Sequence, residues 1–412
     1  MHRIHLTALT ILTLLVPAAG LAQQAVQIPA RDRVLQGEPQ TLFAIGAMEG
    51  ADWETFGDVA QVAFDARDNL YVLDRGNHRV LVFDAQGKFV RQLGKQGSGP
   101  GEFGSPNGMA IEPDGRVFVA DVAHRNYTIF RPDGELERTV PYHQGAGGMI
   151  FRSIQGHPRG GVLVEPAGLR VTPEGPQAYD SLPVLWIRPG ADNADPVQLA
   201  AVPAPETRVS RSGSLGEMRV QFRGPPVFTP QLRWGPLPDG GLALAYETGY
   251  RVHITGPDGK VQRVIERPFR PRKVTEKDKE RARERRREQL ERGIGIVRIT
   301  NEGGRTSTSI GGRMPDEQIK QNLANMEFAE TIPVIFGMRT DPLGRIWVHR
   351  TAEKEYEPGP IDLIAADGRY IGTLQGQAMP DAVSPSGRAA YIERDELDVQ
   401  RVVVKQLPAG WR

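Results

Sequence analysis

The sequence contains no cysteine. Its fold therefore cannot depend on disulfides, and there is no thiol that could carry a lipid anchor. Lysine plus arginine nearly equal aspartate plus glutamate, at 51 and 50 residues, so the charge balance gives no indication of a nucleic-acid partner. Beyond the first residues, no apolar run approaches the roughly 20 residues that cross a bilayer. We expect a soluble mature protein without a membrane span.

The first 22 residues have the three-part pattern of a secretory signal. Arg3 is the only charge in this segment, the apolar run covers residues 6–16, and residues 20–22 end the segment with the small residues Gly20 and Ala22 at the two recognition positions. An uncleaved membrane anchor is the alternative, but an apolar run of about eleven residues is too short to span a bilayer. We therefore expect cleavage after Ala22 and export to the periplasm or the extracellular space.

Only 7% of the residues in the sequence are aromatic, and the part after residue 22 carries an internal repeat. Residues 62–87 and 109–134 superimpose when one is shifted by 47 positions, which places Asp74 on Asp121. Short β-rich segments that recur at such a period, separated by turn signals, are typical of β-propeller blades. The 47 glycines and 33 prolines also fit a turn-rich all-β protein.

The repeat predicts an all-β fold for residues 23–412, a six-bladed β-propeller whose blades are four-stranded antiparallel sheets. The expected blades are residues 62–94, 109–140, 150–190, 232–266, 334–374 and 379–407. Residues 189–231 break the pattern. A seventh blade hidden there is the alternative, because residues 218–222 could form a strand, although no Asp-Gly turn accompanies them.

Residues before the first blade predict how the ring closes. Residues 23–40 read as an irregular lead-in, and residues 41–46 then resemble residues 89–94, the last strand of the first blade. An outer strand without a blade of its own can pair with the final blade, whose outer strand is missing. Such closure removes two strand edges that would otherwise promote aggregation.

Residues 267–333 predict a two-helix insertion between the fourth and fifth blades. Residues 275–292 contain helix formers throughout, with Thr275 as a cap and Gly293 as a stop. Residues 316–328 are amphipathic, with one apolar side formed by Ile319, Leu323, Met326 and Phe328. We expect both helices to pack on the rim or on one face of the ring. The first helix reads as a solvated surface, and a docking site for an acidic partner is the alternative.

With these repeats in place, the chain resembles the NHL-repeat group of six-bladed β-propellers. The resemblance rests on residues 70–80, residues 83–84 and the glycine-rich loop 94–103. The second blade keeps this frame, but it has His-Arg-Asn at 124–126 where the first has Asn-His-Arg at 77–79. The resemblance implies the fold and says little about chemistry, because one fold hosts unrelated functions.

Loops on one face of the ring are the expected functional surface. In a four-stranded blade, the loop between strands two and three opens on the same face as the connection to the next blade. Loops on a rigid scaffold commonly bind ligands. Asp74, Asn77 and Asp121 occupy positions from which side chains bond loop backbone. For Arg79 and Arg125, two roles are possible. Each can form an ion pair with a neighbouring carboxylate, or it can bind a ligand. The candidate ligand-binding residues are Arg79, His124, Arg125, Tyr250, Arg251, His349 and Arg350.

Histidines on the same loops raise the question of a metal. His78, His124 and His349 come from equivalent loops and could converge on the channel, where imidazoles could bind zinc. Related propellers include a zinc-dependent lyase acting on peptidyl-hydroxyglycines, and lactonases with Glu, Asn and Asp around a divalent metal. No motif of either transfers to this chain. The sequence also lacks a G-x-S-x-G motif, a phosphate loop and a zinc-helix signature. It therefore assigns no catalytic residue, no metal ligand and no cofactor, with a zinc or calcium ion as the alternative.

These observations predict an exported, monomeric propeller that acts as a ligand-binding or protein-interaction scaffold. Its loop face over the central channel would hold a small polar or anionic ligand, a peptide, a glycan or a partner protein. The alternative is a metal-dependent propeller enzyme, either a lactonase or other hydrolase, or a lyase. A protein–protein adaptor is a third class, which an exposed apolar patch on residues 316–328 or on the ring would indicate.

Overall fold

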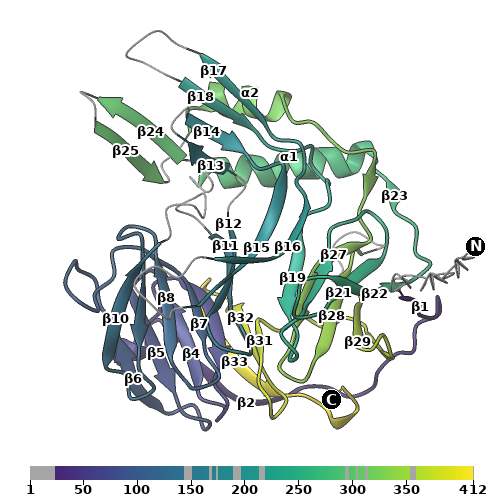
Figure 1. Cartoon of the computed structure of the whole chain (residues 1–412). Helices are drawn as coiled ribbons and strands as arrows, with labels where there is room; N and C mark the ends of the chain where they lie inside the picture. The colour runs from purple at the N-terminus through teal and green to yellow at the C-terminus, as the bar shows by residue number, and fades with distance from the viewer. Residues whose placement is uncertain are drawn as a thin grey trace, which may run out of the picture.

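The computed structural model describes residues 24–142, 151–166, 169–172, 175–188, 196–212, 219–292, 297–302, 305–310, 314–352 and 359–411. Six blades form a closed ring, and two helices and several short hairpins lie outside it (Figure 1). The predicted fold class, a six-bladed β-propeller of four-stranded antiparallel blades with a two-helix insertion, is confirmed.

Blades 1 and 2 each consist of four consecutive strands, ordered from the centre of the ring to its rim. Blade 1 comprises β3 (Val59–Phe64), β4 (Leu70–Asp74), β5 (Arg79–Phe83) and β6 (Phe89–Leu93). Blade 2 comprises β7 (Pro106–Ile111), β8 (Val117–Asp121), β9 (Asn126–Phe130) and β10 (Leu136–Pro141).

The remaining blades follow the same order. Blade 3 comprises β11 (Phe151–Gly156), β12 (Val162–Pro166), β15 (Ser181–Ile187) and β16 (Val197–Pro203). Blade 4 comprises β19 (Arg233–Pro236), β20 (Leu242–Ala245), β21 (Arg251–Thr255) and β22 (Val261–Glu266). Blade 5 comprises β27 (Ile335–Thr340), β28 (Arg345–Arg350), β29 (Ile361–Ala365) and β30 (Tyr370–Leu374). Blade 6 comprises β31 (Ala382–Val383), β32 (Arg388–Arg394), β33 (Gln400–Gln406) and, from the N-terminal part, β2 (Gln40–Ile45).

The middle strands of the blades supply the core, because neighbouring blades pack against both of their faces. Every residue of β4, β5 and β8 is buried, and their sequences are nearly continuous apolar runs. The outer strand β6 instead alternates between part-buried and exposed residues until its last position. Each middle strand thus buries side chains between two blades, and the resulting apolar runs are what the repeat shows in the sequence.

Glycine ends the turn between the third and fourth strands. Gly87, Gly134, Gly259 and Gly368 have φ angles of 81°, 96°, 78° and 90°. Residues with a Cβ adopt this left-handed region only with strain, whereas glycine adopts it freely. The recurrence of this glycine at one place in the blade explains why the repeat can be found from the sequence.

The N-terminal part closes the ring as predicted. β2 pairs antiparallel with β33 and places Ala44 opposite Val403. The expectation of an irregular lead-in before it is wrong, because β1 (Gln24–Gln27) pairs parallel with β22 and forms a fifth strand of blade 4. The sequence does not indicate this strand, because it is only four residues long and its partner β22 lies more than 200 residues further along the chain.

Blade 3 extends beyond its predicted end at residue 190, because its outer strand β16 begins at Val197. The connection from β15 to β16 has no Asp-Gly turn, so the signal that marks the other outer strands is missing. The segment that follows holds β17 (Arg208–Ser212) and β18 (Arg219–Arg223), which form a two-stranded hairpin. The alternative of a seventh blade there is therefore wrong.

Segments outside the ring form a second body, here called the insertion lobe. In Figure 1 it lies beyond β15, β16 and β19. It contains the β17–β18 hairpin together with β13 (Leu169–Thr172), β14 (Gly175–Ala178), β23 (Arg272–Lys273), α1 (Glu276–Glu291), β24 (Val297–Glu302), β25 (Arg305–Ile310), α2 (Asp316–Ala324) and β26 (Thr331–Ile332).

Both predicted helices are present, but the second is shorter than expected. Thr275 caps α1, since its hydroxyl accepts a hydrogen bond from the Asp278 backbone N–H. In return, the Asp278 carboxylate accepts a hydrogen bond from the Thr275 backbone N–H. α2 ends at Ala324 and does not reach Phe328. The chain leaves the helix there because the following residues pair with Val227 through backbone hydrogen bonds. Neither helix has the length and apolar composition that a bilayer crossing requires.

All parts of the insertion lobe leave the ring on one face. The β13–β14 hairpin connects the second and third strands of blade 3, the β17–β18 hairpin connects blades 3 and 4, and the helices connect blades 4 and 5. Successive strands run in opposite directions, so these three kinds of connection open on the same side. This side, which also carries the loops after β4, β8, β20, β28 and β32, is called the loop face.

Candidate functional site

Arg79, at the loop-face end of blade 1, is engaged inside the protein. Its Nε donates to Asp74 Oδ2 at 3.0 Å and its Nη1 pairs with Asp52, and only 3% of the residue is exposed. Asp74 also accepts the backbone N–H groups of Gly57 and Asp58, which fixes the connection that enters the blade. Of the two roles that the sequence left open for Arg79, the structure therefore shows the ion pair with a neighbouring carboxylate.

Blade 2 repeats part of this arrangement. Asp121 accepts the backbone N–H groups of Gly104 and Ser105, and His124 Nδ1 lies 2.9 Å from Asp121 Oδ2. Arg125 follows with a φ of +55° and is exposed. Its guanidinium forms no ion pair with any other residue that the structure describes, so Arg125 stays available on the loop face.

Arg251 is partly exposed but paired within blade 4. Its guanidinium lies 3.1 Å from Glu247 and 2.7 Å from Glu266. Glu247 also lies 2.7 Å from His253 Nε2, and the Tyr246 ring stacks on that imidazole with centroids 4.8 Å apart. The charge of Arg251 is therefore compensated inside its own blade.

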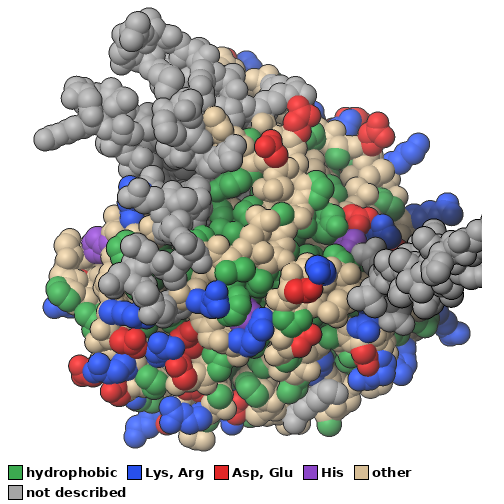
Figure 2. All heavy atoms as spheres, in the orientation of Figure 1, with side chains coloured by type: hydrophobic (Ala, Val, Ile, Leu, Met, Phe, Trp, Pro, Cys, Tyr) green, Lys and Arg blue, Asp and Glu red, His purple; other side chains and the backbone are tan. Residues whose placement is uncertain are grey.

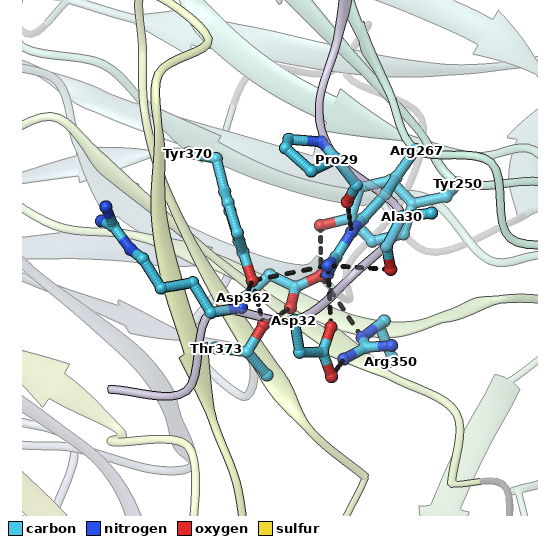
Figure 3. Close-up of polar contacts among 10 residues, drawn as sticks. Pro29, Ala30, Asp32, Tyr250, Arg267, Arg350, Asp362, Tyr370 and Thr373 are labelled. Carbon is cyan, nitrogen blue, oxygen red and sulfur yellow. Dashed lines mark hydrogen bonds and ion pairs between the residues drawn. The ribbon is translucent and has the colours of Figure 1, made fainter. Parts of the chain in front are cut away.

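Tyr250 and Arg350 lie in a buried ionic cluster between blades 4 and 5 (Figure 3). The Tyr250 hydroxyl donates to Asp362 Oδ2 at 2.9 Å, and Arg350 Nε lies 3.3 Å from the same oxygen. Arg267, the residue after β22, donates to it from Nη1 at 2.8 Å. The side chains of Arg267 and Asp362 have no exposed surface. Burial and then the charge of Asp362 raise the pKa of Tyr250 well above its ordinary value.

Asp32 completes this cluster from the N-terminal segment. Its two carboxylate oxygens accept hydrogen bonds from Arg267 and Arg350, each at 2.7 Å. Partial burial acts to raise the pKa of Asp32, but the hydrogen bonds and charges of Arg350 and Arg267 outweigh it and lower that pKa below its ordinary value. Two arginines thus face two aspartates, and Tyr250 and Arg350 hold the blades and the N-terminal segment together.

His349 lies near the loop-face end of β28, beside Phe336. The two rings meet edge to face with centroids 5.4 Å apart. Phe336 belongs to β27, the innermost strand of blade 5, and 61% of it is exposed. Burial lowers the pKa of His349, and a hydrogen bond with the Gly359 backbone only partly opposes that shift, so the imidazole is neutral at pH 7. An aromatic ring held in this way offers a stacking surface to a ligand.

A β-bulge places Phe336 in this position. Ile335 pairs with Arg350 and Gly337 pairs with His349, so Phe336 is the extra residue. An extra residue bends the strand and re-aims its side chain. The innermost strands of three other blades carry a bulge at the same place, with the extra residues Ala60, Asn107 and Arg152. The bulge is thus part of the blade architecture, and blade 5 puts an aromatic residue on it.

Arg233 approaches Phe336 from the neighbouring innermost strand, β19. Its Nε donates to the Phe336 carbonyl oxygen at 3.1 Å. A guanidinium, a neutral imidazole and an exposed phenyl ring therefore meet at the mouth, and we call Arg233, Phe336 and His349 the mouth cluster. Sequence reasoning found His349 and missed the other two. An apolar residue in a predicted strand indicates core, and a bulge leaves no signature in a single sequence.

His78, His124 and His349 do not converge on a metal. Within the described part of the chain, no group of three or more histidine, aspartate or glutamate side chains is arranged to hold a metal ion. His124 is engaged with Asp121, and His349 lies against Phe336. Among the described residues, these histidines therefore do not belong to a group of ligands that could hold a metal ion.

The surface in the orientation of Figure 1 carries acidic and basic side chains interspersed, without a continuous field of one sign (Figure 2). This pattern agrees with the formal net charge of +1. A protein that binds a nucleic-acid backbone presents a basic stripe or patch. The visible face has no such stripe.

Known proteins resemble part of this chain in sequence. A family model described as a 6-bladed beta-propeller matches residues 47–139. The RING finger protein nhl-1 of Caenorhabditis elegans is 52% identical over 48 residues, a stretch that covers 12% of this chain and 5% of that protein. The matched stretch is therefore a small part of that relative.

Solved structures resemble the ring at low sequence identity. A gluconolactonase from Xanthomonas campestris is 14% identical with a TM-score of 0.39, over 92% of this chain and 100% of that one. A virginiamycin B lyase from Staphylococcus aureus is 10% identical with a TM-score of 0.36, over 85% and 96% of the two chains. Scores at this level carry no argument about function. The six four-stranded blades make this chain a six-bladed β-propeller, and part of its sequence is similar to an NHL-repeat protein.

Proposed function

We propose that this protein is an exported binding scaffold whose loop face holds a ligand at the mouth of the central channel. The observation that carries the proposal is Phe336, an aromatic side chain that is 61% exposed on the innermost strand of a blade. Large apolar side chains on innermost strands of a ring normally pack against the neighbouring blade. The bulge turns this one outward, next to His349 and Arg233.

The chemistry of the mouth cluster suggests the class of ligand. The Phe336 ring can stack on a planar group or on the apolar face of a sugar. Arg233 and the exposed Arg125 supply positive charge on the same face of the ring, while His349 supplies a neutral imidazole. We therefore propose a small polar or anionic molecule with a planar or ring-shaped part, free or as a side chain of a peptide or glycan.

The placement of the insertion lobe supports the loop face as the binding face. In repeat proteins, insertions gather on one face, which is often the face that binds. All three insertion points of the lobe lie on the face that carries the mouth cluster. Blades 1 and 2, in contrast, keep short loops of four residues between β4 and β5 and between β8 and β9.

Export is part of the proposal because of the sequence before residue 23. The pattern of one early positive charge, an apolar run and a small-residue end favours a secretory leader. The absence of cysteine fits a protein that folds outside the cytoplasm without depending on disulfide formation. N-terminal sequencing of the protein recovered from outside the cytoplasm tests the cleavage after Ala22.

Replacing Phe336 with alanine is expected to weaken ligand binding without lowering the stability of the ring. Thermal-shift screening with aromatic carboxylates, monosaccharides and oligosaccharides, and short acidic peptides identifies a probe. Calorimetry then measures its Kd. Loss of the stacking surface should raise that Kd at least about tenfold, or ~1.4 kcal/mol.

The matched control is Leu397→Ala, which removes an apolar residue that is 70% exposed in the loop between β32 and β33. It should leave the Kd within about twofold of the wild-type value. A probe that binds Phe336→Ala as tightly as the wild type places its site elsewhere and contradicts the mouth cluster.

A further inference from the structure

The segment from β1 to β2 runs along the rim of the ring and touches three successive blades. β1 pairs with β22 in blade 4, Val34 bridges Thr373 in β30 of blade 5, and β2 pairs with β33 in blade 6. We call residues 24–39 the strap. The strap lies on the outer edges of the sheets, away from the innermost strands that carry the mouth cluster.

The strap is fixed to blade 4 by backbone pairing and by buried apolar side chains. The Ile28 N–H donates to the Glu266 carbonyl oxygen at 2.9 Å, and the Ile28 side chain is only 4% exposed within the core of blades 4 and 5. Val26 lies so close to Gly368 that a Cβ on this glycine would come within 2.8 Å of Val26 Cγ1. Because Gly368 lies in the turn between β29 and β30 of blade 5, the rim of blades 4 and 5 is shaped around these two side chains.

The strap meets blade 5 in the same manner. The Thr373 N–H donates to the Arg33 carbonyl oxygen at 2.8 Å, and the Leu35 N–H donates to the Thr373 carbonyl oxygen at 2.9 Å. Leu35 packs over Gly372, where a Cβ would come within 2.6 Å of the leucine. Backbone hydrogen bonds combined with side-chain pockets are the features by which sheets bind extended peptides through strand addition.

Between these two contacts, Asp32 supplies a carboxylate to the buried arginine pair. Arg267 and Arg350 each donate to it at 2.7 Å, and Arg267 also donates from Nε to the Pro29 carbonyl oxygen at 2.7 Å. Without the strap, the two guanidinium groups would face Asp362 alone. A buried charge without its partner is strongly unfavourable, so the rim requires a carboxylate at this point.

We propose that the rim of blades 4 and 5 is a peptide-binding groove, selective for an extended peptide whose carboxylate bridges Arg267 and Arg350. The proposed occupant is the strap of a second copy of this chain, which takes the place of the chain's own strap. The groove selects a peptide with apolar side chains at the positions of Val26 and Ile28 and a carboxylate at the position of Asp32. This inference concerns the rim and goes beyond the ligand site proposed for the mouth cluster.

The test separates the strap from β2 in the folded, full-length chain. Residues 36–38 are exposed, so a protease site can be introduced there and cut after folding. A fluorescent peptide of residues 24–36 is then added, and its uptake is followed by anisotropy. The wild-type peptide should bind saturably and displace the cut strap. A peptide with Asp32→Asn should bind at least about tenfold more weakly, because it leaves the arginine pair without its second carboxylate.

A peptide with Arg31→Ala is the matched control, since Arg31 is an exposed neighbour of Asp32, and its affinity should stay within about twofold. A second arm needs no cut. The full-length chain carrying Asp32→Asn has a weakened strap and should take up the wild-type peptide at least about tenfold better than the unmodified chain, whose groove is filled. Equal binding of the Asp32→Asn and wild-type peptides, or no uptake in either arm, would overturn the proposal.

Discussion

Replacing Asp362 with alanine lowers the free energy of unfolding by about 3–5 kcal/mol, as expected when one partner is removed from a buried ion pair. Asp362 has no exposed side-chain surface and accepts from Arg267, Tyr250 and Thr373 at 2.8, 2.9 and 2.6 Å. Its loss leaves two arginines with only Asp32 and leaves two hydroxyl groups without their acceptor. The change therefore acts on blades 4 and 5 and on the strap together.

Urea unfolding, monitored by tryptophan fluorescence, measures this loss. Glu393→Gln is the matched control, because Glu393 also forms an ion pair, at 3.0 Å with Lys405, but is 45% exposed. Exposed pairs contribute about 0–1 kcal/mol, so the control should unfold close to the wild type. Similar midpoints for Asp362→Ala and Glu393→Gln would show that the buried ionic cluster does not contribute the stability expected of a buried ion pair.

Replacing Trp347 with alanine is expected to cost about 3–5 kcal/mol, the range for removing a fully buried tryptophan. Trp347 is 1% exposed in the core of blades 5 and 6, and its Nε1 donates to Asp341 Oδ2 at 2.8 Å. The substitution leaves a large cavity between two blades. It also removes a donor from Asp341, whose carboxylate orders the turn before β28 by accepting the Leu343 and Arg345 N–H groups.

Phe336→Ala provides the comparison within the same blade. Phe336 is 61% exposed whereas Trp347 is 1% exposed, so the two aromatic truncations differ in burial above all. The Phe336 variant should unfold within about 0.5 kcal/mol of the wild type, as surface substitutions usually do. A destabilisation of Phe336→Ala as large as that of Trp347→Ala would contradict the exposed position of Phe336 and remove the basis of the mouth cluster.

The sequence was sufficient to predict the ring because the blade repeats local signals. The apolar runs of β4 and β8 and the turn glycines Gly87 and Gly134 recur with one period, and each signal is contained within a few residues. The closing strand could be predicted for the same reason, since residues 41–46 resemble an outer strand of the repeat. Blade 3 was placed too short because its outer strand follows a connection that lacks the turn signal.

The strap and the ionic cluster could not be predicted, because their partners are far apart in the chain. Asp32 contacts Arg267 and Arg350 across 235 and 318 positions of sequence. A lone aspartate in a lead-in and an arginine after a strand carry no mutual signal in one sequence. For the same reason, Tyr250 and Arg350 were placed on the loop face as ligand residues, while the structure commits their polar groups to Asp362 and Asp32.

The mouth cluster could be predicted only in part, for a different reason. His349 was found because it occupies a loop position of the repeat, whereas Phe336 reads as a core residue of a strand. Its exposure depends on the bulge between Ile335 and Gly337, which is a property of strand pairing and not of residue type. The function proposed for this site therefore rests on the structure more than on the sequence.

The most direct test of the architecture is a cross-link between the N-terminal and C-terminal parts of the ring. The chain has no cysteine, so a disulfide can form only where two are introduced. Ala44 lies opposite Val403 in the β2–β33 pair, at a spacing of about 5 Å between Cβ atoms that suits a disulfide. Ala44 and Glu393 instead lie two strands apart and two residues out of register, at more than about 10 Å, which is too far.

Oxidation of the Ala44→Cys/Val403→Cys variant should give a disulfide and raise the Tm, because the bond joins the closing strand to the last blade. The Ala44→Cys/Glu393→Cys variant should keep free thiols under the same conditions. A chain that cross-links in the second variant and not in the first would show that β2 does not close the sixth blade, and the closed ring described here would be wrong.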